Sequence, residues 1–113
     1  MKEERLQANC VFWLWNTYPE TRGLFVLVNN NPLNAIDGAR KKALGLISGV
    51  SDTVFFWKGR TYFIEFKNEK GKQSPAQVEF QQKVEHQGFK YNVIRTEEEF
   101  RFWMENIIQS HDE

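Results

Sequence analysis

The segment Gly49–Lys67, with the sequence GVSDTVFFWKGRTYFIEFK, decides the fold of this chain. Two runs rich in aromatic and β-branched residues flank Lys58-Gly59, a composition typical of two β-strands joined by a short turn. Both runs are apolar on each face of the predicted strands, as in strands at the centre of a sheet. The segment therefore predicts a central β-hairpin.

The charged residues of this segment gather at one end of the predicted hairpin. A two-residue turn pairs Trp57 with Arg60, and the same register places Asp52 opposite Glu65. Lys67 lies two residues beyond Glu65 and therefore shares its face of the strand. Directly opposed like charges destabilise a sheet. Either a cation lies between the two carboxylates, or a three-residue turn shifts the register by one residue.

Two carboxylates and an amine on one face suit metal-assisted hydrolysis. Mg²⁺ is typically held by one or two carboxylates with waters and phosphate oxygens, and it activates water and neutralises charge on the phosphate. A lysine can orient the water or stabilise the transition state. The alternative is structural, with Asp52 beginning a strand and Glu65 and Lys67 paired on an exposed face. The apolar surroundings favour the chemical interpretation, because the charges are not part of a solvated stripe.

In order along the chain, these motifs resemble the core of the PD-(D/E)xK nuclease superfamily and specifically its VRR-NUC family. The resemblance rests on Glu3 before Leu6-Gln7 (with Glu4 as the fallback), Gly49-Val50-Ser51-Asp52, Ile64-Glu65-Phe66-Lys67 and Ser74-Pro75-Ala76-Gln77. It covers nearly the whole chain, and the size suits the small stand-alone, phage-type members. The sequence departs from the family at Ser51, where Pro is common. It also lacks a histidine found near Asn30 in some members, so any role of that histidine is left open.

The resemblance implies a restriction-endonuclease-like α/β fold, with a central mixed β-sheet of about four strands flanked by helices. It implies a single nuclease domain over residues 1–113. Hydrophobic periodicity predicts a compatible succession of elements. These are a helix over 3–18, a strand over 24–28, a loop over 29–34, a short helix over 35–46, the hairpin, a loop over 68–73, a helix from 74, a strand over 89–95 and a helix from 96.

The resemblance also implies an activity, a Mg²⁺- or Mn²⁺-dependent nuclease that hydrolyses DNA phosphodiester bonds with a metal-activated water. Asp52, Glu65 and the Phe66 backbone carbonyl would ligate the metal, and Glu3 would add a direct or water-mediated contact. Lys67 would position or activate the water. The alternatives are a non-catalytic nucleic-acid- or protein-binding module that retains the nuclease fold, or a small adaptor. A binding module has no need of two carboxylates and a lysine on one face, and the carboxylates would repel phosphate.

The segment Ser74–Gln77 has two interpretations. Serine as N-cap, proline at the first helical position and glutamine at the capping-box position form a strong helix start. The resemblance instead implies that Gln77 supports the active site. Gln77 and Gln81 share a predicted helix face with Phe80 and Val84, an unusual composition for plain core packing. The site role is favoured.

The charge balance argues against a strong passive DNA binder. Lysine and arginine total 15, aspartate and glutamate total 15, and the formal net charge is zero. A DNA-binding domain usually carries a basic excess, although the metal ions of a nuclease restore positive charge at the site. We therefore expect weak, metal-dependent binding or a homodimer that pools basic patches. The candidate phosphate contacts are Arg40, Lys41, Lys42, Lys70 and Lys72.

The apolar stripes of the first and last helices bear on assembly. One stripe is predicted to face the sheet, which leaves the other for a second copy of the chain. A two-fold dimer would match branched DNA, which has approximate two-fold symmetry.

Cysteine usage and hydropathy bound the location. The single cysteine, Cys10, permits no internal disulfide and no cysteine-based zinc site, and its place on an apolar helix face predicts a buried thiol. No apolar run is long enough to span a bilayer, and the first residues lack the hydrophobic region of a signal peptide. We expect a cytoplasmic location without membrane partners, for a phage-encoded protein in the host cell.

Overall fold

The computed structural model describes residues 2–28 and 32–110, and its elements follow the predicted order. They are α1 (Glu3–Thr17), the 3₁₀ helix η1 (Pro19–Thr21), β1 (Phe25–Leu27), α2 (Ala35–Ala43), β2 (Thr53–Trp57), β3 (Arg60–Phe66), α3 (Pro75–His86), β4 (Lys90–Ile94) and α4 (Glu97–Gln109). Residues 29–31 of the predicted loop and their asparagines lie outside the described residues. Within those residues, no helix is long and apolar enough to cross a membrane.

The predicted hairpin is confirmed in both turn and register. Lys58 and Gly59 connect β2 to β3 with φ values of 50° and 78°, and positive φ at both central positions is what a type I′ turn requires. Trp57 pairs with Arg60, and the antiparallel ladder runs from there to the other end of β2. The two-residue turn thus fixes which side chains share a face all along the hairpin.

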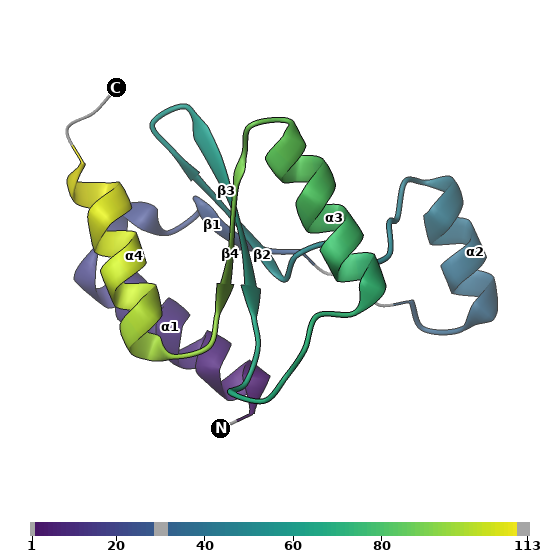
Figure 1. The fold of residues 1–113 in the computed structure, drawn as a ribbon, viewed down its shortest axis with the longest axis horizontal. Coiled ribbons are helices and arrows are strands. Elements are labelled where there is room, and N and C mark those ends of the chain that lie inside the picture. The colour runs from purple at the N-terminus through teal and green to yellow at the C-terminus, as the bar shows by residue number, and fades with distance from the viewer. Residues whose placement is uncertain (1, 29–31, 111–113) are drawn as a thin grey trace.

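The sheet is mixed, with four strands in the order β1-β2-β3-β4. β2 pairs antiparallel with both β1 and β3, and β4 runs parallel to β3. A parallel neighbour requires a crossover connection, and α3 supplies it. Figure 1 shows α1 and α4 on one face of the sheet and α3 on the other, whereas α2 projects away from the sheet beyond α3.

One core lies between the sheet and the α1–α4 layer. Its buried members come from both helices and all four strands, and they include Leu6, Cys10, Leu14, Phe25, Phe55, Ile64, Phe66, Ile94, Phe100 and Met104. The prediction that only one of the two terminal helices faces the sheet is wrong, because Leu14 of α1 and Phe100 of α4 are both fully buried in this core. Burial also raises the pKa of the Cys10 thiol to about 12, so this cysteine is an inert core residue as predicted.

Two capping boxes begin α3 and α4 at the predicted residues. The Ser74 hydroxyl accepts a hydrogen bond from the Gln77 N–H, and the Gln77 side chain accepts one from the Ser74 N–H. Thr96 and Glu99 form the same reciprocal pair at the start of α4. Each box satisfies two backbone donors that a helix start leaves unpaired.

Candidate active site

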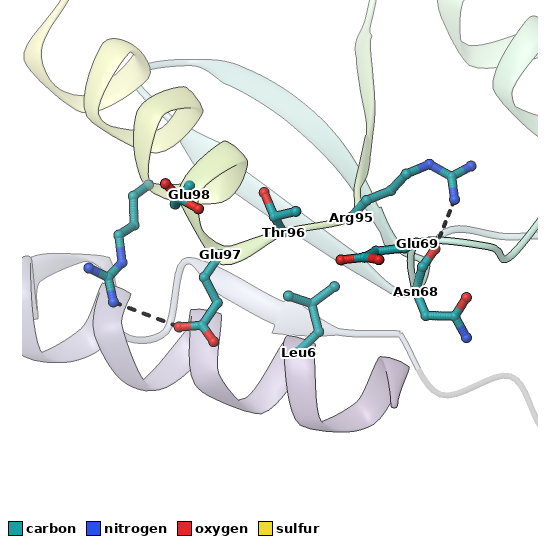
Figure 2. A pocket seen from close by; sticks show the side chains of 8 residues that line it. Leu6, Asn68, Glu69, Arg95, Thr96, Glu97 and Glu98 are labelled. Carbon is teal, nitrogen blue, oxygen red and sulfur yellow. Dashed lines mark hydrogen bonds and ion pairs between the residues drawn. The ribbon is translucent and has the colours of Figure 1, made fainter. Parts of the chain in front are cut away.

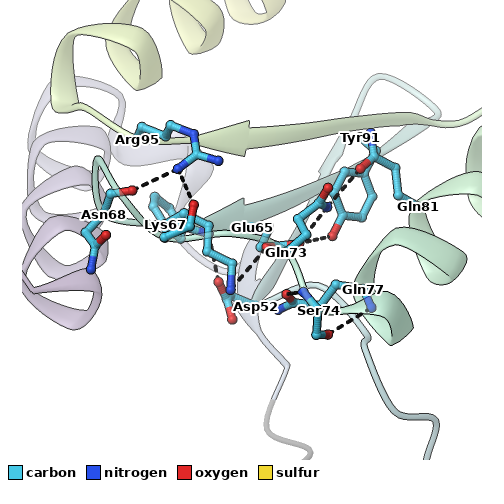
Figure 3. A network of polar contacts seen from close by, with 12 residues as sticks. Asp52, Glu65, Lys67, Asn68, Gln73, Ser74, Gln77, Gln81, Tyr91 and Arg95 are labelled. Carbon is cyan, nitrogen blue, oxygen red and sulfur yellow. Dashed lines mark hydrogen bonds and ion pairs between the residues drawn. The ribbon is translucent and has the colours of Figure 1, made fainter.

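The two predicted metal ligands, Asp52 and Glu65, converge on the α3 side of the sheet (Figure 3). Side chains alternate along β3, so Ile64 and Phe66 enter the core whereas Glu65 points to the opposite face. The Glu65 side chain is nevertheless fully buried. Asp52 precedes β2 by one residue, and its Oδ2 accepts a hydrogen bond of 2.7 Å from the Phe66 backbone N–H. The strand pairing itself therefore orients the Asp52 carboxylate.

Charge on Asp52 is disfavoured in this site. Burial raises the pKa of its carboxyl above the ordinary value, and the neighbouring carboxylates of Glu65 and Glu3 raise it further. The Phe66 N–H and the Lys67 ammonium oppose the shift without cancelling it. Clustered carboxylates with an uncompensated charge are the arrangement that a bound cation relieves.

Lys67 completes the predicted trio. Its Nζ lies 3.6 Å from Glu65 Oε2, and its side chain is only 13% exposed. The Lys67 backbone N–H donates to the Ile94 carbonyl at 3.0 Å, so the residue is anchored to the end of β4. The ammonium is thereby held beside the carboxylates on a backbone that the sheet fixes.

Glu3 reaches the site from the first turn of α1. A Cβ built on Gly71 would lie 3.2 Å from Glu3 Oε2 and 3.4 Å from Lys67 Cδ, so Glu3, Lys67 and the loop after β3 meet at Gly71. The absence of a side chain at Gly71 makes room for this approach. Glu3 and Asp52 then line the same groove.

That groove is the open side of the site, with a volume of about 750 Å³. Its lining includes Glu3, Val28, Lys42, Gly49, Asp52, Ser74 and Gln77. A different hollow, of about 390 Å³, lies between α1, α4 and the loop after β3 (Figure 2). Three glutamates line this hollow, and its two arginines are engaged, Arg95 with the Asn68 carbonyl and Arg101 with Glu97. The hollow is therefore a poor site for a phosphate.

Sequence reasoning missed a polar network behind Glu65. The Tyr91 hydroxyl donates to Glu65 Oε1. Gln73 Nε2 donates to the same oxygen at 3.2 Å and to Gln81 Oε1 at 2.9 Å. Strand alternation together with the need of a buried phenol for a partner could have singled out Tyr91. The sequence could not show that the partner of Tyr91 is Glu65, because the parallel pairing of β3 with β4 is a tertiary feature.

Comparison with known proteins addresses the fold. No family model and no curated protein matches the sequence. The structure superimposes on the solved structure of a VRR_NUC domain protein with a TM-score of 0.80. The chain has a VRR-NUC fold. The match covers 96% of this chain and 89% of that chain at 16% sequence identity. The predicted restriction-endonuclease-like architecture, a mixed four-stranded sheet flanked by helices, is thereby confirmed.

Within this VRR-NUC fold, the groove is built by close packing before Asp52. Gly49 has a φ of +85°, and a Cβ there would lie 2.3 Å from the Ala76 carbonyl carbon. The loop that leads into Asp52 therefore rests directly on the N-terminal turn of α3. Gln77 lines the groove from that same turn, although its Oε1 is held at 2.8 Å by the Ser74 N–H.

The donor set of this site fits a hard divalent cation. Among the described residues, no three histidine, cysteine, aspartate or glutamate side chains group closely enough to hold a metal. The site instead offers Asp52, Glu65 and the Phe66 carbonyl, which points toward the Asp52 side because the N–H and C=O of one strand residue face the same neighbour. Glu65 Oε2 is buried without a hydrogen bond among the described residues. Few carboxylates, supplemented by water, are what Mg²⁺ prefers.

Two of the predicted phosphate contacts on α2 are already paired. Arg40 and Lys41 bind the Asp37 carboxylate at 2.9 Å and 3.0 Å. The hydrogen bond from the Leu33 N–H, together with these ion pairs, lowers the pKa of Asp37 to about 2. Lys42 of the same helix lines the groove instead. Of the three cations on α2, Lys42 is therefore the one directed to the site.

The other predicted contacts lie in the loop between β3 and α3. Lys70 and Lys72 are both exposed there. Arg95 holds the loop from β4, because its Nη1 donates to the carbonyls of Asn68 at 2.9 Å and Gly71 at 2.6 Å. The loop that carries both lysines follows Lys67 and is held at the end of β4 by Arg95.

Proposed function

We propose that this protein is a Mg²⁺- or Mn²⁺-dependent nuclease that hydrolyses DNA phosphodiester bonds. The observation that carries the proposal is the convergence of Asp52, Glu65 and Lys67, held by the β2–β3 register, beside an open groove. The VRR-NUC fold of a 16%-identical neighbour supports the same activity class by analogy.

The residues would divide the work as follows. Asp52, Glu65 and the Phe66 carbonyl would hold the cation, with Glu3 contributing through water. When bound, the cation supplies a water of lowered pKa and neutralises charge that develops on the phosphate. Lys67 would hold the attacking water or a phosphate oxygen in line with the scissile bond.

The supporting residues surround this centre. Gln77 would steady the site from the first turn of α3, where it lines the groove. Lys42, Lys70 and Lys72 would contact flanking phosphates, because lysines at the rim position the nucleic-acid backbone. Arg40 and Lys41 would join them where a phosphate displaces Asp37.

Assembly and location belong to the same proposal. A net charge of zero leaves one copy with little attraction for a polyanion, so we expect a homodimer that acts on branched DNA with approximate two-fold symmetry. We also expect it to act inside a cell, in a phage-infected host. The single cysteine has a free thiol, which is compatible with an intracellular location.

A cleavage assay tests the activity. Linear, flap and four-way-junction DNAs are incubated with the protein in Mg²⁺, Mn²⁺ or EDTA. We expect cutting with either metal, none in EDTA and none from the Glu65→Gln variant. Glu79→Gln is the matched control, because Glu79 is an exposed glutamate on α3 that pairs with Lys83. Metal-independent DNA binding without cleavage by the wild type would favour a non-catalytic binding module.

A further inference from the structure

The two oxygens of the Glu65 carboxylate have different surroundings. Oε1 accepts hydrogen bonds from the Tyr91 hydroxyl and from Gln73 Nε2. Oε2 is buried and has no hydrogen bond among the described residues, and its nearest cation is Lys67 Nζ at 3.6 Å. A carboxylate oxygen with two donors has little capacity left, so only Oε2 is available for a further partner.

Tyr91 is fixed in place as a donor. It lies in β4 directly across from Phe63, on the face that Glu65 shares, and its ring packs edge-on against Phe80 with centroids 6.2 Å apart. Its hydroxyl contacts Glu65 Oε1, and an ionised carboxylate has only acceptor oxygens. Tyr91 is therefore the donor in this hydrogen bond.

Gln73 is oriented by a second acceptor. Its Nε2 donates to Glu65 Oε1 and to Gln81 Oε1, and Gln81 in turn donates to Glu85 Oε2 at 3.2 Å. An amide between two acceptors must present its nitrogen, which removes the ambiguity of its orientation. The chain of contacts ties the loop before α3 to α3 itself (Figure 3).

We infer that Tyr91 and Gln73 are positioning residues that hold Glu65 so that it offers a single oxygen, Oε2, to a divalent cation. This inference rests on the proposed function, and it adds two residues that the sequence motifs do not contain. Without the two donors, the buried carboxylate would be free to rotate about its terminal bond and would lose the hydrogen bonds that stabilise its charge. Cation binding then requires reordering of Glu65.

Calorimetry with Mn²⁺ on the full chain without DNA tests this inference. Hydrogen-bond partners of metal ligands typically contribute 10–100-fold to metal affinity, so Tyr91→Phe should bind Mn²⁺ about 10–100-fold more weakly than the wild type. Gln73→Met, which keeps the side-chain length and removes the amide, should weaken binding in the same direction. Tyr62→Phe is the matched control, because Tyr62 is equally buried but faces the core. It should bind Mn²⁺ as the wild type does.

The outcomes separate this inference from the proposed function. Wild-type Mn²⁺ affinity in both Tyr91→Phe and Gln73→Met overturns the inference, even if their melting temperatures fall, since that result assigns both residues a structural role alone. If Tyr91→Phe does not fold, Gln73→Met decides. Absence of Glu65-dependent Mn²⁺ binding in the wild type overturns both proposals. A further outcome is that the wild type binds Mn²⁺ and cuts no DNA, while both variants bind Mn²⁺ more weakly. That result supports the inference and refutes the proposed nuclease activity.

Discussion

Lys67 shares a face with the carboxylates, and in the proposed site it would not ligate the cation. Its ammonium lies 3.6 Å from Glu65 Oε2, so its removal would eliminate a competitor of the metal and not a ligand. We expect Lys67→Ala to retain Mn²⁺ binding and to lose cleavage rate by roughly 10²–10⁴-fold, the range for a positioned proton-transfer or electrostatic group. Calorimetry and single-turnover cleavage measure the two effects separately.

The control for this prediction is Lys72→Ala, an exposed lysine of the same loop. It should change affinity for DNA more than the chemical step, because phosphate contacts position the substrate. Near-normal turnover by Lys67→Ala would reduce Lys67 to a counter-ion of Glu65.

The raised pKa of Asp52 has a consequence for stability without metal. A carboxyl whose pKa is raised by folding stabilises the native state most below its unfolded value of 3.8, and that contribution is lost as the pH rises through the higher folded value. At neutral pH the charged Asp52 therefore destabilises the metal-free protein. Asp52→Asn keeps an acceptor for the Phe66 N–H, and we expect it to melt at a higher temperature than the wild type in EDTA at neutral pH.

Thermal unfolding at several pH values checks this sign, and the advantage of Asp52→Asn should shrink toward pH 3.8. Asp37→Asn is the control, because the pKa of Asp37 is shifted in the opposite direction to that of Asp52. Its carboxyl has a pKa lowered to about 2 by the Leu33 N–H and by Lys41 and Arg40, so its replacement should not stabilise the protein at neutral pH. A lower melting temperature for Asp52→Asn would show that its hydrogen bond outweighs the charge repulsion.

At the scale of elements, local signals predicted most of the fold. Lys58-Gly59 determines the hairpin turn, and Ser74 and Thr96 begin their helices, because each signal acts within a few residues. The network of Tyr91 and Gln73 was missed because it joins β4 to the loop before α3, and no local pattern encodes that contact. The prediction that only one of the α1 and α4 stripes faces the sheet was wrong for the same reason, because the packing of both helices on the sheet is a tertiary feature.

Gly49 joins two elements by backbone contact. Alanine there would place its Cβ 2.3 Å from the Ala76 carbonyl carbon and would keep a φ of +85°, which costs an L-residue about 1–2 kcal/mol before any clash. We expect Gly49→Ala to lower the free energy of unfolding by more than that and to weaken Mn²⁺ binding, because Asp52 follows closely. Urea unfolding and calorimetry measure both effects.

Gly45→Ala isolates the contribution of strain. Gly45 also has a positive φ, of +109°, but a Cβ there meets nothing within 4 Å. It should therefore lose stability by the strain alone and keep its Mn²⁺ affinity. Equal losses of stability in the two variants would show that the loop before Asp52 moves away from α3 at little cost.

Gln77 takes part in both the α3 cap and the groove. Glutamate serves equally at this capping-box position, so Gln77→Glu should leave the melting temperature unchanged. The groove would then contain another carboxylate near Asp52, and we expect cleavage to fall at least several-fold. Glu99→Gln, the reverse change in the box of α4, is the control and should leave both stability and cleavage unchanged. Unchanged cleavage by Gln77→Glu would restrict Gln77 to capping.

At the scale of the whole molecule, the two faces of the sheet have different tasks. The α1–α4 face contains the apolar core, whereas the α3 face carries buried charge and opens into the groove. Positive potential at that groove must come from few cations, because the net charge is zero and Asp37 engages Arg40 and Lys41. Lys42 and Lys67 supply part of this positive potential. A bound metal and a second copy of the chain are the two sources that would increase it.

The projecting helix α2 is the surface on which we expect the second copy to bind. Leu33, Ile36 and Leu44 on and beside this helix are 86%, 84% and 75% exposed, and grouped apolar side chains of this kind mark interaction sites. Light scattering at micromolar concentration should give about twice the chain mass of 13.4 kDa. The double variant Ile36→Glu/Leu44→Glu should give the chain mass alone with an unchanged circular dichroism spectrum.

Phe12→Glu is the matched control for the dimer, because Phe12 on α1 is 72% exposed and lies outside α2. It should leave the dimer intact, and dissociation by Phe12→Glu alone would move the interface to the α1–α4 layer. A species of 13.4 kDa in the wild type that still cuts branched DNA would refute the dimer. A single active site engages one strand at a time, so that result would point to linear ends or flaps as the substrate.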